Sequence, residues 1–229
     1  MNGPPRPRGT DNLVIVRAGP VALEGDLRIP EGARGVVLFA HGSGSSRHSP
    51  RNRFVAEFLR DARLGTLLID LLTAQEETAE AATGHLRFDI DLLAGRLVAI
   101  SDWLRGHPAT GPLALGYFGA STGAAAALVA AAQRPEDVRA VVSRGGRPDL
   151  AWSALPQVTA PTLLIVGERD STVLDLNREA LRALHVEKAL AVVPRATHLF
   201  EEPGALEEVA RLAREWFSRH LTPGDDVER

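Results

Sequence analysis

A serine, an aspartate and a histidine occur in this chain in an order that suits nucleophilic catalysis. Ser121 is the central residue of GASTG, Asp170 ends VGERD, and His198 lies within ATHLF. In a triad of this kind the histidine takes the proton of the serine hydroxyl as the oxygen attacks a carbonyl carbon, and the acid orients the imidazole. The chemistry indicated is acyl transfer through a covalent acyl-enzyme. A G-x-S-x-G pattern alone is weak, so its value depends on the elements that hold these residues.

Ser121 stands between an apolar run and an alanine-rich segment. Residues 113–118 predict a buried strand, and residues 124–133 predict a closely packed helix. A serine between flanking glycines at such a turn is typical of a nucleophile elbow, where the first N–H groups of the helix face a developing oxyanion. We therefore expect Ser121 to be the nucleophile and the N–H of Thr122 to be one oxyanion donor. A junction that serves packing only, or a phosphate-binding loop, is the alternative for the motif by itself.

The loop HGSGSS, residues 41–46, follows the continuous apolar run 35–40, which fits a strand buried on both faces. Its glycines permit close approach of the backbone, so we expect the N–H of Ser43 to be the second oxyanion donor and Gly44 to lie beside the substrate. A flexible Gly/Ser loop is one alternative. A P-loop is another, but the Lys-Ser/Thr ending is missing. His41 is expected to be a structural hydrogen-bonding residue.

The acid and the histidine both follow predicted strands that come after Ser121. Asp170 is preferred to its neighbours Glu168 and Asp175, because the turn directly after a strand lets a carboxylate reach a histidine on the next loop. The earlier Asp70 is expected to anchor a loop. No two histidines have an H-x-x-x-H spacing, so no metal site is predicted.

Strands and helices alternate along most of the chain, which predicts an α/β fold with a mostly parallel sheet of about eight strands and helices on both faces. Residues 73–84 are expected to be a surface connection. Residues 144–160 are too few for a cap domain, so the pocket should be open. The expected strands are 13–17, 21–29, 35–40, 64–72, 113–118, 138–143, 161–166 and 189–193, and the expected helices are 51–62, 87–104, 122–133, 173–184 and 205–220.

The composition is that of an ordinary globular protein of 229 residues, with 45% hydrophobic and 24% charged residues. A single domain over residues 13–222 is expected, with flexible ends at 1–12 and 223–229. The formal net charge of −3 argues against a nucleic-acid partner. The absence of cysteine excludes a thiol nucleophile and Cys-based metal sites. No signal-peptide pattern or long apolar run occurs, so no membrane association and a cytoplasmic location are expected.

The four segments HGSGSS, GASTG, VGERD and ATHLF together resemble the α/β-hydrolase superfamily, and within it the small, capless hydrolases similar to dienelactone hydrolase. The resemblance extends over residues 13–220. It implies Ser121 as nucleophile, Asp170 as orienting acid and His198 as base, with no cofactor. Dienelactone hydrolases themselves use a cysteine nucleophile, whereas this chain has a serine. The resemblance therefore implies hydrolysis of a small-molecule carboxylic ester, lactone or thioester.

Two other functional classes are consistent with the same residues. An acyltransferase would use the same triad with an alcohol or amine as acceptor, and a non-catalytic binding protein would use the fold alone. Arg144 and Arg147 follow the predicted strand 138–143 and are candidates for attracting an acidic substrate. Solvation, or pairing with Asp149, is the alternative for both arginines. A homodimer is a further expectation that the sequence leaves open.

Overall fold

The structure, a computed structural model, describes residues 12–222, with the side chains of residues 80–83 excepted. The ends predicted to be flexible lie outside this range, apart from Asn12. The carbonyl oxygen of Asn12 accepts a hydrogen bond from the N–H of Leu27 at 3.0 Å.

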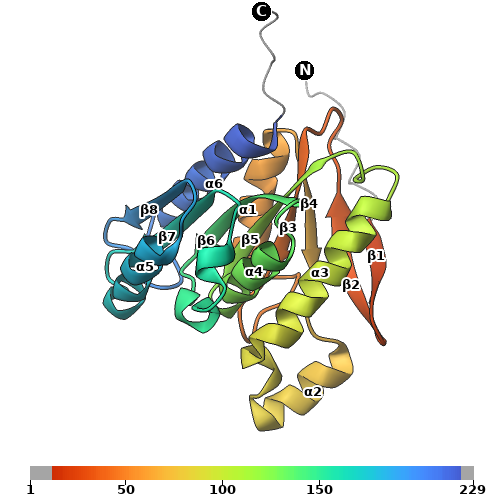
Figure 1. Cartoon of the computed structure of the whole chain (residues 1–229), viewed down its shortest axis with the longest axis horizontal. Coiled ribbons are helices and arrows are strands. Elements are labelled where there is room, and N and C mark those ends of the chain that lie inside the picture. Colours follow the sequence, from red (N-terminus) through yellow and green to blue (C-terminus); the bar gives the residue numbers. More distant parts are fainter. Residues whose placement is uncertain (1–11, 223–229) are drawn as a thin grey trace, which may run out of the picture.

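Within the described residues a single sheet forms the centre of the molecule (Figure 1). Its strands lie in the order β1-β2-β4-β3-β5-β6-β7-β8. Strand β2 is antiparallel to both β1 and β4, and the remaining neighbours are parallel. The mostly parallel eight-stranded sheet predicted from the sequence is therefore confirmed. The strands are β1 (Leu13–Ala18), β2 (Val21–Arg28), β3 (Gly35–Ala40), β4 (Leu64–Ile69), β5 (Ala114–Ala120), β6 (Val138–Arg144), β7 (Thr162–Gly167) and β8 (Lys188–Val193).

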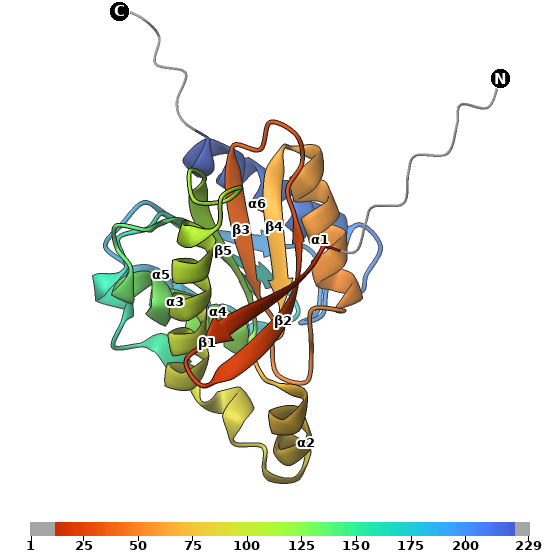
Figure 2. The same cartoon turned by 90° about the vertical axis from the view of Figure 1, so that its right-hand side faces the viewer.

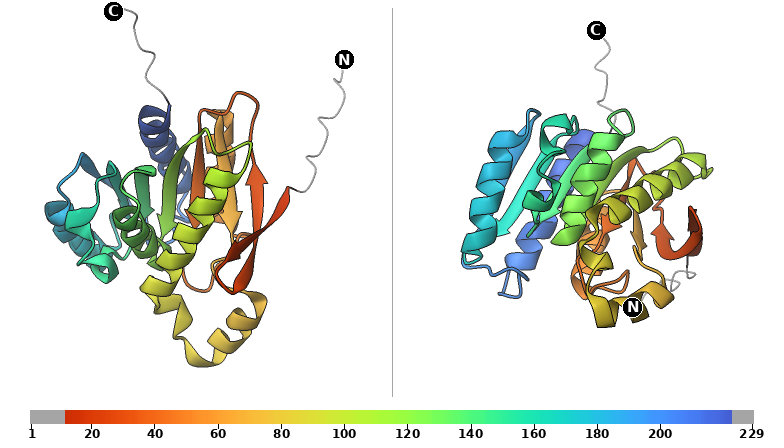
Figure 3. Two further views of the ribbon diagram at one scale, coloured as in Figure 1. Left: turned by 45° about the vertical axis from the view of Figure 1, so that its right-hand side comes forward. Right: turned by 60° about the horizontal axis from the view of Figure 1, so that its bottom comes forward.

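Helices cover both faces of this sheet (Figure 3). One apolar layer joins the sheet to α1 (Pro50–Asp61) and α6 (Ala205–Leu221). The other joins it to α3 (Ile90–Gly106), α4 (Thr122–Gln133) and α5 (Ser171–Ala183). Because both faces are covered, every residue of β3, β4 and β7 is buried, which explains their continuous apolar sequences.

The remaining elements are short helices in the connections. Helix α2 (Ala74–Thr83) stands away from the sheet, beyond the carboxyl ends of the parallel strands (Figure 2). Short 3₁₀ turns occur at η1 (Leu86–Phe88), η2 (Pro148–Ala151) and η3 (Leu155–Gln157). The last two occupy the connection after β6, which holds no cap domain, as expected.

The surface connection expected at residues 73–84 contains a helix that was not predicted, α2, which begins with a capping box. The Thr73 N–H donates to Glu76 Oε2 at 2.8 Å, and the Glu76 N–H donates to Thr73 Oγ1 at 3.2 Å. This reciprocal pair satisfies donors that a helix start leaves free. The next helix also begins later than residue 87. Asp89 is its N-cap and accepts a hydrogen bond from the Leu92 N–H at 3.0 Å.

Candidate active site

Ser121 lies at the turn from β5 into α4 in a backbone conformation that side chains rarely adopt, with φ 51° and ψ −120°. The glycines of GASTG make this turn possible. A β-carbon at Gly123 would lie 2.3 Å from the carbonyl oxygen of Ala40, and one at Gly119 would lie 2.4 Å from the Cα of Ala124. The loop after β3 therefore packs directly on the turn that presents the serine.

Asp170 and His198 come together from two different loops. His198 Nδ1 lies 2.6 Å from Asp170 Oδ2, and the aspartate side chain is 15% exposed against 39% for the histidine. The rival acids are engaged elsewhere. Glu168 accepts a hydrogen bond from the Arg195 N–H at 2.7 Å, and Asp175 forms an ion pair with Arg178 at 2.9 Å. Of the three acids considered in the sequence, the structure thus brings Asp170 to the histidine.

The end of β6 connects Ser121 to His198. The N–H of Ser121 donates to the carbonyl oxygen of Arg144 at 3.2 Å. The next residue, Gly145, has a φ of +52°, and a β-carbon there would lie 3.4 Å from Cε1 and Nδ1 of the His198 ring. The dipeptide Arg144–Gly145 therefore contacts both the backbone of Ser121 and the imidazole of His198. These contacts place Ser121 and His198 at the same edge of the sheet.

The loop of residues 41–46 differs from the expected oxyanion-binding arrangement in one hydrogen bond. The N–H of Ser43 donates to Thr122 Oγ1 at 3.0 Å, so the threonine side chain occupies a donor that we expected to face the oxyanion. Thr122 itself is 2% exposed. This contact was not predictable from the sequence, because it depends on the side-chain rotamer of Thr122 and on how closely the loop approaches.

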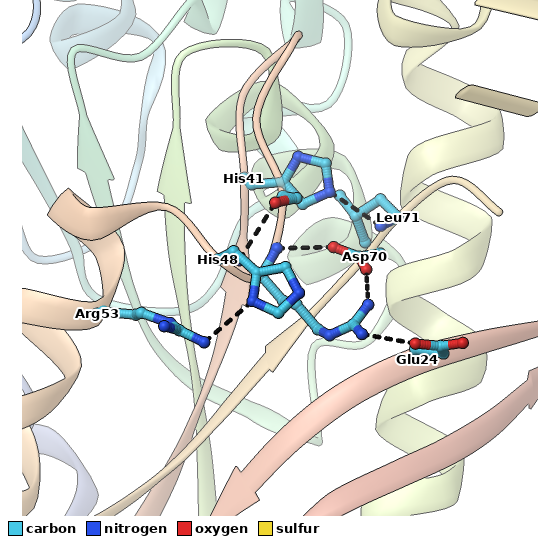
Figure 4. Close-up of polar contacts among 8 residues, drawn as sticks. Glu24, His41, His48, Arg53, Asp70 and Leu71 are labelled. Carbon is cyan, nitrogen blue, oxygen red and sulfur yellow. Dashed lines mark hydrogen bonds and ion pairs between the residues drawn. The ribbon is translucent and has the colours of Figure 1, made fainter. Parts of the chain in front are cut away.

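Polar contacts to neighbouring strands and loops hold this loop in place (Figure 4). His41 Nε2 accepts a hydrogen bond from the Leu71 N–H at 3.0 Å. Asp70 accepts one from the Arg47 N–H at 2.7 Å and pairs with the Arg47 guanidinium, which also contacts Glu24 at 2.5 Å. His41 and Asp70 therefore have the structural positions that we expected for them.

A cleft extends from the loop of residues 41–46 towards α2. Its wide part has a volume of about 400 Å³ and is bordered by Gly44, Arg47 and Asp70. A narrow part of about 10 Å³ continues to Ser43 and Thr122, and Gly44, Leu72 and Glu77 border both parts. Gly44 therefore borders this cleft, and its contact with substrate stays a prediction. Glu77, on the helix that sequence analysis missed, forms part of the wall.

The two candidate arginines after β6 have different surroundings. Arg147 donates two hydrogen bonds to Asp149, at 2.9 and 2.7 Å, and these raise the pKa of Arg147. Arg144 is only 8% exposed and lies 5.9 Å from the ring centre of Phe200. Burial, together with repulsion from Arg51, lowers the pKa of Arg144 to about 10. Arg147 is therefore paired with Asp149, which was the alternative to a role in substrate binding. Arg144, by contrast, is enclosed beside the His198 loop.

The described part of the chain contains no group of three or more His, Cys, Asp or Glu side chains placed to bind a metal ion. Over the same residues, none of the helices has both the length and the apolar character needed to cross a membrane.

Two solved structures have a similar fold. A dienelactone hydrolase from Anabaena variabilis is 64% identical, with a TM-score of 0.90 over 91% of this chain and 97% of that one. An α/β serine hydrolase without a lid from Xanthomonas campestris has a TM-score of 0.72 at 22% identity, over 92% of this chain and 96% of that one. At that identity the second similarity concerns the fold alone.

Curated relatives are longer than this chain. Two proteins of Mycobacterium tuberculosis strains, each named a putative phosphoribosyl transferase, are 60% identical over 211 residues. The match includes 92% of this chain but 47% of each relative, so the chain spans about half the length of the curated relatives it matches.

The family model described as "Dienelactone hydrolase family" matches residues 62–221 of this chain. The matched range includes the GASTG, VGERD and ATHLF segments. With an α/β-hydrolase fold and a hydrolase relative of high identity, the chain belongs to the dienelactone hydrolase family.

Proposed function

We propose that this protein is a serine hydrolase that cleaves a carboxylic ester through an acyl-enzyme on Ser121. The observation that supports the proposal best is the 2.6 Å contact between His198 Nδ1 and Asp170 Oδ2 at the edge of the sheet where Ser121 is presented. A lactone or a thioester has the same reacting carbonyl and is included. Serine at the position of the family's cysteine favours a general ester hydrolase over one restricted to dienelactones.

Proton transfer begins at the imidazole. When His198 Nδ1–H donates to Asp170, Nε2 is left unprotonated and is able to accept the proton of the Ser121 hydroxyl. Ser121 Oγ then bonds to the carbonyl carbon, and the carbonyl oxygen becomes the tetrahedral oxyanion. The protonated His198 returns its proton to the leaving alcohol. Water, deprotonated by the same nitrogen, releases the acid and restores the serine.

The oxyanion would lie between the N–H groups of Thr122 and Ser43. In the free enzyme the Ser43 N–H donates to Thr122 Oγ1. An oxyanion is a stronger acceptor than a neutral hydroxyl, so we propose that the N–H moves from the hydroxyl to the oxyanion as charge develops. This exchange would make the contact stronger in the transition state than in the ground state, which is the condition for catalysis.

We attribute the phosphoribosyl transferase activity named for the curated relatives to the part of those proteins outside the matched residues. In this chain, the residues that match the hydrolase family model include the candidate triad. Phosphoribosyl transfer by this segment is therefore not part of the proposal.

Labelling with a fluorophosphonate tests the proposal, because this reagent reacts with an activated serine. We expect a single adduct on Ser121 by peptide mapping, its absence in Ser121→Ala, and much slower labelling in His198→Ala. Ester turnover should fall roughly 10³-fold or more in either variant if the residues act as a unit. Ser43→Ala is the matched control, because it removes a nearby hydroxyl but keeps the backbone N–H. An adduct on another residue, or ester hydrolysis unchanged in Ser121→Ala, would refute the proposed function.

A further inference from the structure

The segment at the end of β6, residues 144–147, holds the backbone of Ser121 from both sides. The N–H of Ser121 donates to the carbonyl oxygen of Arg144, and the N–H of Arg147 donates to the carbonyl oxygen of Ser121, each at 3.2 Å. The φ of 51° at Ser121 is a strained value for a residue with a side chain. Strain of this kind persists only where the surroundings impose it, so this segment, which we call the β6 loop, helps to fix the direction of the serine hydroxyl.

The β6 loop also touches the candidate base. The N–H of Gly145 donates to the carbonyl oxygen of Ile165 in β7 at 2.8 Å, and a β-carbon on Gly145 would lie 3.4 Å from atoms of the His198 ring. On the side of α4 the loop is equally close, because a β-carbon on Gly146 would lie 2.8 Å from that of Ala124. A shift of this loop would therefore move the serine and the imidazole relative to each other.

One buried side chain of α5 binds the β6 loop. Asn177 is 0% exposed, and its Nδ2 donates to the carbonyl oxygens of Gly146, at 3.0 Å, and of Val173, at 2.7 Å. The same helix begins at the candidate acid, since Asp170 is its N-cap and the Asp170 carbonyl oxygen accepts a hydrogen bond from the Leu174 N–H at 2.8 Å. Helix α5 thus carries the acid and is bonded to the loop that contacts both the nucleophile and the base.

Asn177 is a costly residue if it serves packing alone. Its Oδ1 is buried without a hydrogen-bond partner among the described residues. A buried polar atom without a partner destabilises a fold, and a leucine of similar size would avoid that cost. Val173 lies in the same helix as Asn177, so the contact by which the amide joins two elements is the one to Gly146. The cost is explained if this bond serves the site.

We propose that Asn177 is a positioning residue for the acylation of Ser121. Through the carbonyl oxygen of Gly146 it fixes the β6 loop, and with it the distance and angle between Ser121 Oγ and His198 Nε2. Proton transfer between these atoms requires close alignment, and a misplacement of about 1 Å costs of order 10²-fold in rate. Asn177 acts through the loop and not by contact with the substrate. The inference rests on the proposed function, because it concerns the same nucleophile and base.

Asn177→Leu tests this role, because leucine keeps the size of the side chain and removes the donor. We expect fluorophosphonate labelling of Ser121, and kcat/KM for p-nitrophenyl acetate, to fall by about ten- to a hundredfold. The pH at which labelling is half-maximal should not change, because the contact between His198 and Asp170 is retained. A merely structural role would slow labelling only in proportion to the fraction of unfolded protein, which circular dichroism measures at the same temperature.

Ser101→Ala is the matched control. Ser101 is 0% exposed on α3, and its hydroxyl shares a hydrogen bond of 2.7 Å with that of Tyr117, so alanine also removes one buried side-chain hydrogen bond. We expect a lower urea midpoint for this variant and an unchanged rate of labelling. Asn177→Ser, whose shorter side chain is withdrawn from Gly146, takes the place of Asn177→Leu if the leucine variant does not fold.

Labelling in the Asn177 variants within twofold of the wild-type rate would overturn the inference and leave the proposed function intact. Equal slowing in Ser101→Ala would overturn it too, because the loss of any buried hydrogen bond would then have the same effect. A changed half-maximal pH would show that Asn177 acts on the pair of His198 and Asp170 instead. If the wild type shows neither labelling nor ester turnover, the proposed function is rejected, and this inference with it.

Discussion

At Gly123, two residues after the candidate nucleophile, the fold leaves no space for a side chain. A β-carbon there would lie 2.3 Å from the carbonyl oxygen of Ala40 and 2.4 Å from that of His41. Both are backbone atoms, so neither can turn aside as a flexible side chain does. Any larger residue must push α4 away from the loop that carries Ser43, the proposed oxyanion donor.

We therefore expect Gly123→Ala to lower the free energy of unfolding by about 3 kcal/mol and to abolish labelling of Ser121. Gly95→Ala is the matched control, because Gly95 is an exposed position within α3 with no atom within 4 Å of the added carbon. Alanine there should raise the free energy of unfolding by about 0.5–1 kcal/mol. Denaturant titration of both variants gives the comparison, and equal stability of the two would contradict the close approach.

The contact between Asp170 and His198, and the turn that holds Ser121, were predictable because the order of these residues and their positions after strands are local features of the sequence. The hydrogen bond from Ser43 to Thr122 was not, since it joins residues that only the folded chain brings together. The burial of Arg144 was unpredictable for a similar reason. It depends in part on packing against Phe200, which is remote from Arg144 in the sequence.

Among the elements, α2 is anchored by one buried arginine of α3. Arg96 is 5% exposed, donates to the carbonyl oxygen of Leu71, and contacts Glu76 Oε1 at 2.5 Å. Burial alone would raise the pKa of Glu76, but hydrogen bonds from Arg96 and Thr73 outweigh it, so the pKa is lowered. A lowered carboxylate pKa stabilises the fold above the pKa of the unfolded chain, near 4.5, and this contribution is lost as the pH falls through the lower folded value.

Glu76→Gln should therefore reduce the free energy of unfolding at pH 7 by about 1–3 kcal/mol, with the difference from the wild type shrinking below about pH 4.5. Urea titrations at several pH values measure this. Glu77→Gln, at the exposed neighbouring position, serves as control and should change little at any pH. A Glu76→Gln effect of the same size at pH 7 and pH 3 would show that the carboxylate charge is not what Arg96 recognises.

Helix α2 was not predicted from the sequence, and its own composition explains why. Helix α2 has a weak apolar face, so hydrophobic periodicity gave no signal, whereas the T-x-x-E capping box was present in the sequence. Its other anchor, Arg96, is 20 residues away from Glu76 along the chain. Strongly amphipathic α5 and α6, by contrast, were predicted to within two residues of their observed ends.

On the scale of the whole molecule, the sheet divides the core into two apolar layers that share every central strand. Trp103 on α3 packs against one layer, and Trp216 on α6 packs against the other. Because the same strands support both layers, we expect them to unfold together. Trp103→Phe and Trp216→Phe proteins, each with one fewer tryptophan reporter, should show equal fluorescence midpoints that coincide with that of far-ultraviolet circular dichroism. Separate midpoints would mean that the layers are independent units.

The sheet architecture was the feature of the molecule most easily predicted from the sequence. Buried strands between amphipathic helices leave few topologies, because parallel crossovers are right-handed and need helices on both faces. The place of β2, between β1 and β4, was not predicted. Its alternating sequence is typical of an antiparallel strand but does not identify its partners.

The strained backbone of Ser121 has a consequence for how this sequence changes over time. At φ 51° and ψ −120° a side chain costs of order 1–3 kcal/mol, whereas glycine adopts this region readily. The fold alone would thus gain stability by exchanging the serine for glycine. Selection for stability alone would favour replacement of Ser121. In a lineage that no longer used the serine hydroxyl, we would therefore expect the serine to be lost. A serine retained in this conformation is a mark of continuing selection for its chemistry.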